Sequence, residues 1–148
     1  MTPTSWRVVL AAFLSAGVLG WVLLDTSYGD LVKLPTYAAA TAGLAAVFEL
    51  VLARIVSTKV RGTSRGRPMH PLQVARAAAL GKASSLAGAL LLGLYSGFVT
   101  WLLPRRGDLA AADDDVVVAA VSGVACLVLL VAALLLERAC RTPKPPDD

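Results

Sequence analysis

The chain has 148 residues, of which 57% are hydrophobic and only 16% are charged. Soluble domains are about 45–50% apolar, so this composition and a mean hydropathy of +0.70 argue against a soluble globular protein. The net charge of +4 does not indicate a nucleic-acid partner, because the basic residues cluster beside long apolar segments.

Four apolar segments fill most of the chain, and the sequence predicts helices over residues 6–24, 35–56, 77–103 and 116–136. Each segment can cross the hydrocarbon core of a bilayer, which needs about 20 helical residues. We therefore expect an all-α, four-transmembrane-helix bundle that forms one integral membrane domain over residues 1–148. Its lipid partner is the bilayer itself.

The first segment has two interpretations, a cleaved signal peptide or a retained transmembrane helix. Arg7 precedes the apolar run, as in a signal peptide. However, Trp21 and the bulky residues 22–24 stand where a small-residue cleavage site would be needed. The sequence therefore favours a retained helix.

The second segment contains Glu49, the only acidic residue well inside an apolar segment. An ionised carboxylate at membrane depth costs at least a few kcal/mol, so it needs a partner or a proton. Lys82 lies at a similar depth early in the third segment, and we expect a Glu49–Lys82 ion pair, with Arg54 and Arg76 as alternative partners. This pair could hold the two helices in register, or Glu49 could bind a proton or a cationic ligand; both interpretations stay open.

The basic loop over residues 57–76 sets the predicted orientation. Lysine and arginine beside membrane helices mark the cytoplasmic side, whereas the other two loops are acidic. With four spans, both termini are then cytoplasmic, and all but three of the 14 basic residues lie inside. Anionic lipid headgroups are the expected partners of the loop arginines, Arg61, Arg65, Arg67 and Arg76.

The third segment carries small residues at every fourth position. Such residues let another transmembrane helix approach closely. We expect this helix to be the packing centre of the bundle or the face of a homo-oligomer or of a contact with another membrane protein. The residues of this small-residue stripe are Ala77, Gly81, Ser85, Ala89, Gly93 and Gly97.

No catalytic, cofactor-binding or metal site is expected from the sequence. Cys126 and Cys140 lack the spacing of metal ligands, and His70 has no companion ligands. No histidine or aspartate pair lies at membrane depth for acid–base chemistry, so an enzyme is not predicted.

The centre of the chain resembles a known family. The run over residues 68–97 has proline, then arginine, then lysine and spaced glycines, in the residues Pro71, Arg76, Lys82, Gly88, Gly93 and Gly97. It resembles an uncharacterised actinobacterial family of small multi-pass membrane proteins, usually encoded beside folate-biosynthesis genes. Gly81 departs from this pattern, which has alanine there. The resemblance implies a bacterial inner-membrane location and no particular activity.

The sequence thus predicts a non-enzymatic accessory or scaffold protein of the bacterial inner membrane. The alternative is a small four-helix transporter that uses Glu49 for proton or cation coupling. In size and span count the chain is similar to small multidrug exporters, but those carry their key glutamate in the first helix, where this chain has none.

Overall fold

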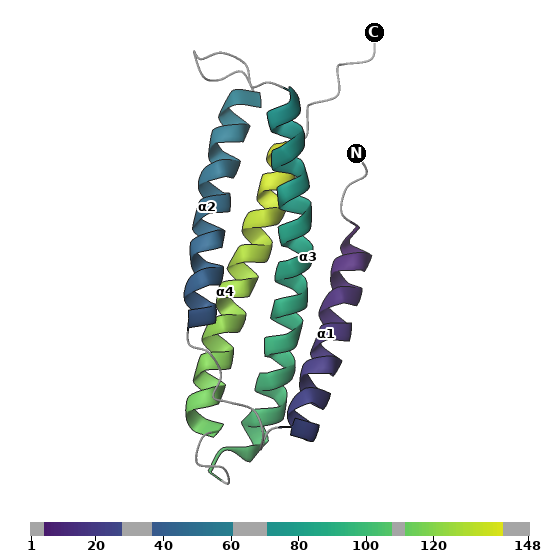
Figure 1. Ribbon diagram of the computed structural model, residues 1–148, viewed down its shortest axis with the longest axis vertical. Coiled ribbons are helices and arrows are strands. Elements are labelled where there is room, and N and C mark those ends of the chain that lie inside the picture. The colour runs from purple at the N-terminus through teal and green to yellow at the C-terminus, as the bar shows by residue number, and fades with distance from the viewer. Residues whose placement is uncertain (1–4, 28–36, 61–70, 108–111, 141–148) are drawn as a thin grey trace.

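Four long helices dominate the computed structural model, which describes residues 5–27, 37–60, 71–107 and 112–140. All four are long and apolar enough to cross a membrane, and the described residues contain no strand. The predicted all-α, four-helix architecture is therefore confirmed (Figure 1). The helices are α1 (Trp6–Ser27), α2 (Tyr37–Val60), α3 (Pro71–Leu102) and α4 (Ala112–Ala139), and a 3₁₀ turn, η1 (Leu103–Arg105), follows α3.

The helices extend beyond the apolar segments of the sequence. The expected loop over residues 57–76 is helical at both ends, because α2 continues to Val60 and α3 begins at Pro71. Proline suits the first helical position, where its missing N–H costs no hydrogen bond. α4 starts at Ala112, and its acidic first turn (Asp113, Asp114 and Asp115) suits the positive end of the helix dipole. The apolar segments therefore mark the membrane-spanning part of each helix, and each segment is shorter than the helix to which it corresponds.

The packing order of the helices differs from their chain order. α3 packs along both α1 and α4, α2 packs along α4, and α2 meets α3 only briefly. Among the described helices, α1 contacts neither α2 nor α4. The order in space is therefore α1, α3, α4, α2, with α3 and α4 as the central pair (Figure 1).

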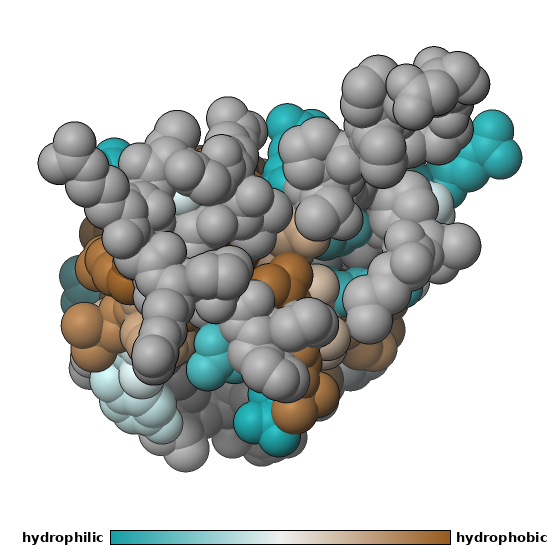
Figure 2. Space-filling view, turned by 90° about the horizontal axis from the view of Figure 1, so that it is seen from above, coloured by the Kyte–Doolittle hydropathy of each residue, from teal (hydrophilic) through white to brown (hydrophobic). Residues whose placement is uncertain are grey.

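The two ends of the bundle differ in charge. α1 and α3 begin, and α2 and α4 end, toward the top of Figure 1. We call this the basic end, because the described helices carry Arg7, Arg54, Arg76, Lys82 and Arg138 toward it. Seen from above, hydrophilic surface appears at several points among hydrophobic residues around this end (Figure 2).

α1 is staggered relative to α3. Phe13 lies beside Gly93 and Gly17 beside Gly97, so Trp6 is level with the residues near Leu86. α3 begins at Pro71 and so extends about 15 residues, or roughly 22 Å, beyond the start of α1 at 1.5 Å per residue. The part of the bundle nearest the basic end is therefore built from α2, α3 and α4 alone.

Candidate functional site

Glu49 is the most unusual side chain in the bundle. It lies on α2 and is only 3% exposed, and its Oε2 atom has no hydrogen-bond partner among the residues that the structure describes. The Ser84 hydroxyl of α3 lies within hydrogen-bonding reach of the same carboxyl group. An apolar cluster of Ala46, Leu129 and Ala132 packs between α2 and α4 close to it. A carboxyl group is therefore buried at the place where α2, α3 and α4 meet.

The predicted ion pair between Glu49 and Lys82 does not form in the structure. Lys82 is exposed, and none of the ion pairs among the described residues joins it to Glu49. Lys82 and Ser84 are two residues apart, so their side chains leave α3 about 200° apart, on nearly opposite sides. Because Ser84 faces Glu49, Lys82 faces away from it. The two alternative partners, Arg54 and Arg76, are exposed as well and form no ion pair within the described ranges.

The small-residue stripe of α3 serves two neighbouring helices. All six residues of the stripe are buried: Ala77, Gly81, Ser85, Ala89, Gly93 and Gly97. A Cβ atom added at Gly81 would lie 3.0 Å from Ala133 O of α4. One added at Gly93 would meet Phe13 O of α1, and one at Gly97 would meet Gly17 O of α1. Positions four apart on a helix are offset by about 40°, so the stripe turns by roughly 160° between Gly81 and Gly97.

A polar network ties α1 to α3 at the end of the bundle opposite the basic end. Trp101 Nε1 donates a hydrogen bond to Asp25 Oδ1 at 3.1 Å, and Arg105 Nη2 lies 3.7 Å from the same oxygen. The Arg105 guanidinium also stacks over the Trp101 ring at 3.9 Å and donates to Trp101 O at 2.9 Å. The sequence analysis missed this network. The spacing of Trp101 and Arg105 could have indicated part of this network, because residues four apart lie on one face of a helix.

The arginines of the two ends are neutralised differently. Arg105 pairs with Asp25, and Arg106 lies 4.0 Å from Asp113, so both arginines opposite the basic end have carboxylate neighbours. At the basic end, no ion pair involves Arg7, Arg54, Arg76, Lys82 or Arg138 among the residues that the structure describes. The predicted headgroup contact Arg76 is exposed on α3, and its three companions Arg61, Arg65 and Arg67 lie outside the described residues.

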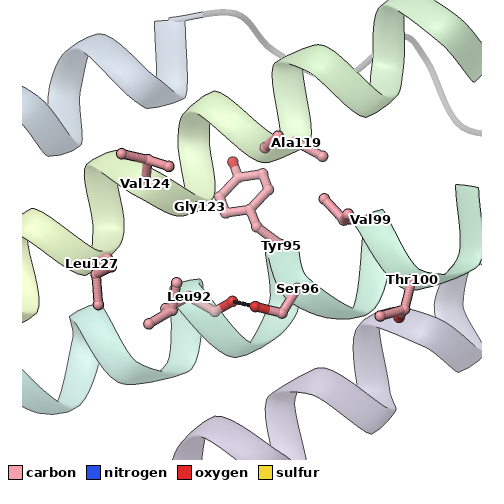
Figure 3. Close-up of a pocket in the computed structure, with 10 residues that line it drawn as sticks. Leu92, Tyr95, Ser96, Val99, Thr100, Ala119, Gly123, Val124 and Leu127 are labelled. Carbon is pink, nitrogen blue, oxygen red and sulfur yellow. Dashed lines mark hydrogen bonds between the residues drawn. The ribbon is translucent and has the colours of Figure 1, made fainter. Parts of the chain in front are cut away.

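A shallow apolar groove of about 320 Å³ runs between α3 and α4 (Figure 3). Tyr95 points from α3 toward α4, between Ala119 and Gly123. Ser96 donates to Leu92 O at 2.7 Å and Thr100 donates to Gly97 O at 2.9 Å. Both hydroxyls are thus bonded to their own helix, and the groove presents mainly hydrocarbon.

No group of three or more histidine, cysteine, aspartate or glutamate residues that could hold a metal ion occurs in residues 5–27, 37–60, 71–107 and 112–140. The free thiols Cys126 and Cys140 belong to the apolar packing of α4, with Cys126 buried and Cys140 partly so. The described residues can therefore hold a buried carboxyl group at Glu49 and pack the helices closely at the glycines of α3.

Comparison with known protein families gives a match over residues 9–144 to a family described as a protein of unknown function, DUF3180. The chain belongs to this family. No curated protein and no solved structure matches the chain.

The DUF3180 match spans all four membrane helices from the first turn of α1 onward. It includes Glu49, Ser84 and the Asp25–Trp101–Arg105 network. The family description assigns no activity to any of these residues, so their roles must be argued from the geometry. The four apolar helices themselves indicate a multi-pass membrane protein.

Proposed function

We propose that this protein is a non-enzymatic accessory or scaffold protein of the bacterial inner membrane. The observation that supports this proposal is the close packing of α3 against α1 and α4, where backbone atoms meet at glycines. Contacts of this kind suit a rigid membrane platform, because backbone atoms cannot move aside as flexible side chains do. The platform would hold a second copy of the chain or another membrane protein.

The proposed orientation places the basic end and both termini in the cytoplasm. It is supported by the difference between the two ends: Arg105 and Arg106 have carboxylate neighbours, whereas the five basic residues of the basic end form no ion pair with any residue that the structure describes. Reporter fusions test it: alkaline phosphatase fused after residue 148 should be inactive, and the same enzyme inserted near residue 108 should be active. The reverse pattern would overturn the orientation.

Anionic lipid headgroups are the proposed partners of the basic end. Exposed cations beside a membrane surface each gain about 1 kcal/mol from such lipids. Native mass spectrometry of the purified protein should show retained phosphatidylglycerol or cardiolipin, and Arg76→Gln together with Lys82→Gln should reduce it. The matched control is Arg105→Gln with Arg106→Gln at the other end, which should leave lipid retention unchanged.

A small transporter is the second candidate, and one observation favours it. A carboxyl group that is 3% exposed and has one oxygen without a partner is typical of proton- and ion-coupled carriers. A carrier must expose Glu49 to each side of the membrane in turn, whereas a scaffold keeps it enclosed.

Proton flux into proteoliposomes separates the two functions. The protein is reconstituted with a pH-sensitive dye inside, and a pH gradient is applied across the membrane. A scaffold should give the leak of empty vesicles, both as wild type and as Glu49→Gln. A flux that Glu49→Gln abolishes, while Glu137→Gln retains it, would replace the scaffold proposal with the transporter.

The actinobacterial source and a link to folate-biosynthesis genes rest on the sequence resemblance alone. They stay part of this proposal. Comparing the gene neighbours of DUF3180 members across bacterial genomes would test the link.

A further inference from the structure

We propose that Glu49 is a proton-binding site: at neutral pH its side chain is a carboxylic acid held between α2, α3 and α4. This inference goes beyond the scaffold function, because neither a scaffold nor its partners require the proton. It rests on burial, on hydrogen bonding and on the positions of the surrounding charges.

The immediate surroundings of Glu49 provide one polar group. The carboxyl group is 3% exposed, Oε2 has no partner, and the Ser84 hydroxyl is the hydrogen-bonding neighbour. A carboxylate accepts hydrogen bonds at both oxygens and needs several donors to be stable without water. A protonated carboxyl group needs fewer partners, and its O–H can donate to Ser84 Oγ while its carbonyl oxygen accepts.

Within the described residues, no ion pair joins Glu49 to a charged side chain of the three surrounding helices. On α2, Arg54 is exposed. On α3, Lys82 is exposed and leaves the helix on the side opposite Ser84, and Arg76 lies two turns further toward the basic end. On α4, Glu137 is 9% exposed, and as an acid it brings no positive charge to this half of the bundle. The apolar packing around Glu49 disfavours the ionised form further.

The chemistry of the site fits a proton better than a metal cation. Sodium and divalent cations need several oxygen ligands, about six for magnesium and six to eight for calcium. Glu49 and Ser84 provide three side-chain oxygens between them, and no group of three metal-binding side chains occurs among the described residues. A proton needs only the one oxygen to which it is covalently bound.

Release of the proton breaks the O–H bond of the acid, leaves a carboxylate on Glu49 and passes one proton to water. Glu49 is 11 residues before Val60, so it lies about 16 Å from the end of α2 at the basic end.

Infrared spectroscopy tests the proposal without altering Glu49. The chain has two glutamates, so ¹³C-labelled glutamate in a Glu137→Gln variant places the label on Glu49 alone. In lipid at pH 7, we expect a carbonyl band of the protonated acid that carries the isotope shift. Ser84→Ala should move this band, because the hydrogen bond is lost, and Ser85→Ala, whose hydroxyl bonds Lys82 O, should not.

Two results would overturn the inference. One is a labelled band at the carboxylate position at pH 7, which would mean that Glu49 is ionised. The other is a protonated band that is insensitive to Ser84→Ala, which would mean that the acid lies outside the described site. Neither result depends on the flux assay, so the scaffold proposal and the proton site can fail separately.

Discussion

Replacing Gly97 by alanine should detach α1 from α3. A Cβ atom at Gly97 would meet Gly17 O of α1 and would lie 2.9 Å from Trp21 N. Both are backbone atoms, so no side-chain rotation can make room and α1 itself must move. Gly43 of α2 is the matched control, because a Cβ atom added there meets no atom within 4 Å.

The size of the effect follows from comparing the two variants. Glycine to alanine within a helix stabilises by about 0.5–1 kcal/mol when space is available. Overpacking of a close contact costs about 1–3 kcal/mol. Gly43→Ala should therefore raise the free energy of unfolding slightly, and Gly97→Ala should lower it. The helix-propensity gain is common to both variants, so they should differ by about 1–3 kcal/mol.

The assay is unfolding of the protein in bicelles by added sodium dodecyl sulfate. Tryptophan fluorescence is a suitable signal, because the Trp101 side chain is buried and donates a hydrogen bond from α3 to Asp25 of α1. If Gly97→Ala unfolds at the same detergent fraction as Gly43→Ala, α1 does not lie against α3 as described. The stripe would then have to face another partner.

Three further predictions concern the polar network and the thiol. Asp25→Asn keeps an acceptor for Trp101 Nε1 and removes only the half-exposed pair with Arg105, so detergent unfolding followed by circular dichroism should show a loss below about 1 kcal/mol. Trp101→Phe loses the hydrogen bond to a charged acceptor and weakens the Arg105 stacking, and the same assay should show a loss of about 1.5–3 kcal/mol. Equal losses for the two variants would contradict the network. Burial, and next the Glu137 carboxylate, raise the pKa of the Cys140 thiol, so maleimide labelling should be slow at pH 7 and accelerate with rising pH. Glu137→Gln should lower that pKa and speed labelling at neutral pH, and an unchanged rate would mean that Glu137 does not act on Cys140.

The sequence predicts the number and approximate place of the helices because the bilayer sets a minimum apolar length. It also predicts close packing along α3, since small residues at one spacing are a property of a single helix, but it does not show that α4 shares the centre of the bundle. It does not identify which helix covers which part of the stripe. The lipid-facing and the protein-facing sides of these helices are both apolar, so hydropathy does not show which helix packs against which.

The Glu49 prediction shows the same limit in more detail. Depth along the membrane placed Glu49 level with Lys82, and Ser84 lies two residues further along α3 at nearly the same depth. Depth alone could not choose between these two side chains. The side of α3 decides this choice, and it depends on α2 packing mainly along α4. Trp101 is a similar case: a tryptophan near the end of an apolar segment is typical of the membrane interface, and nothing in the sequence shows that it donates to Asp25.

The order of packing constrains how the protein assembles during synthesis. α1 leaves the ribosome first, yet its one described neighbour is α3, and α2 must likewise wait for α4. The first two helices therefore enter the bilayer without a mutual contact, and the glycines of α1 face lipid until α3 is inserted. The contact between α1 and α3 can form as soon as α3 is inserted, and α4 then packs on α3 and gives α2 its main neighbour. The second half of the chain is thus the template on which both helices of the first half dock.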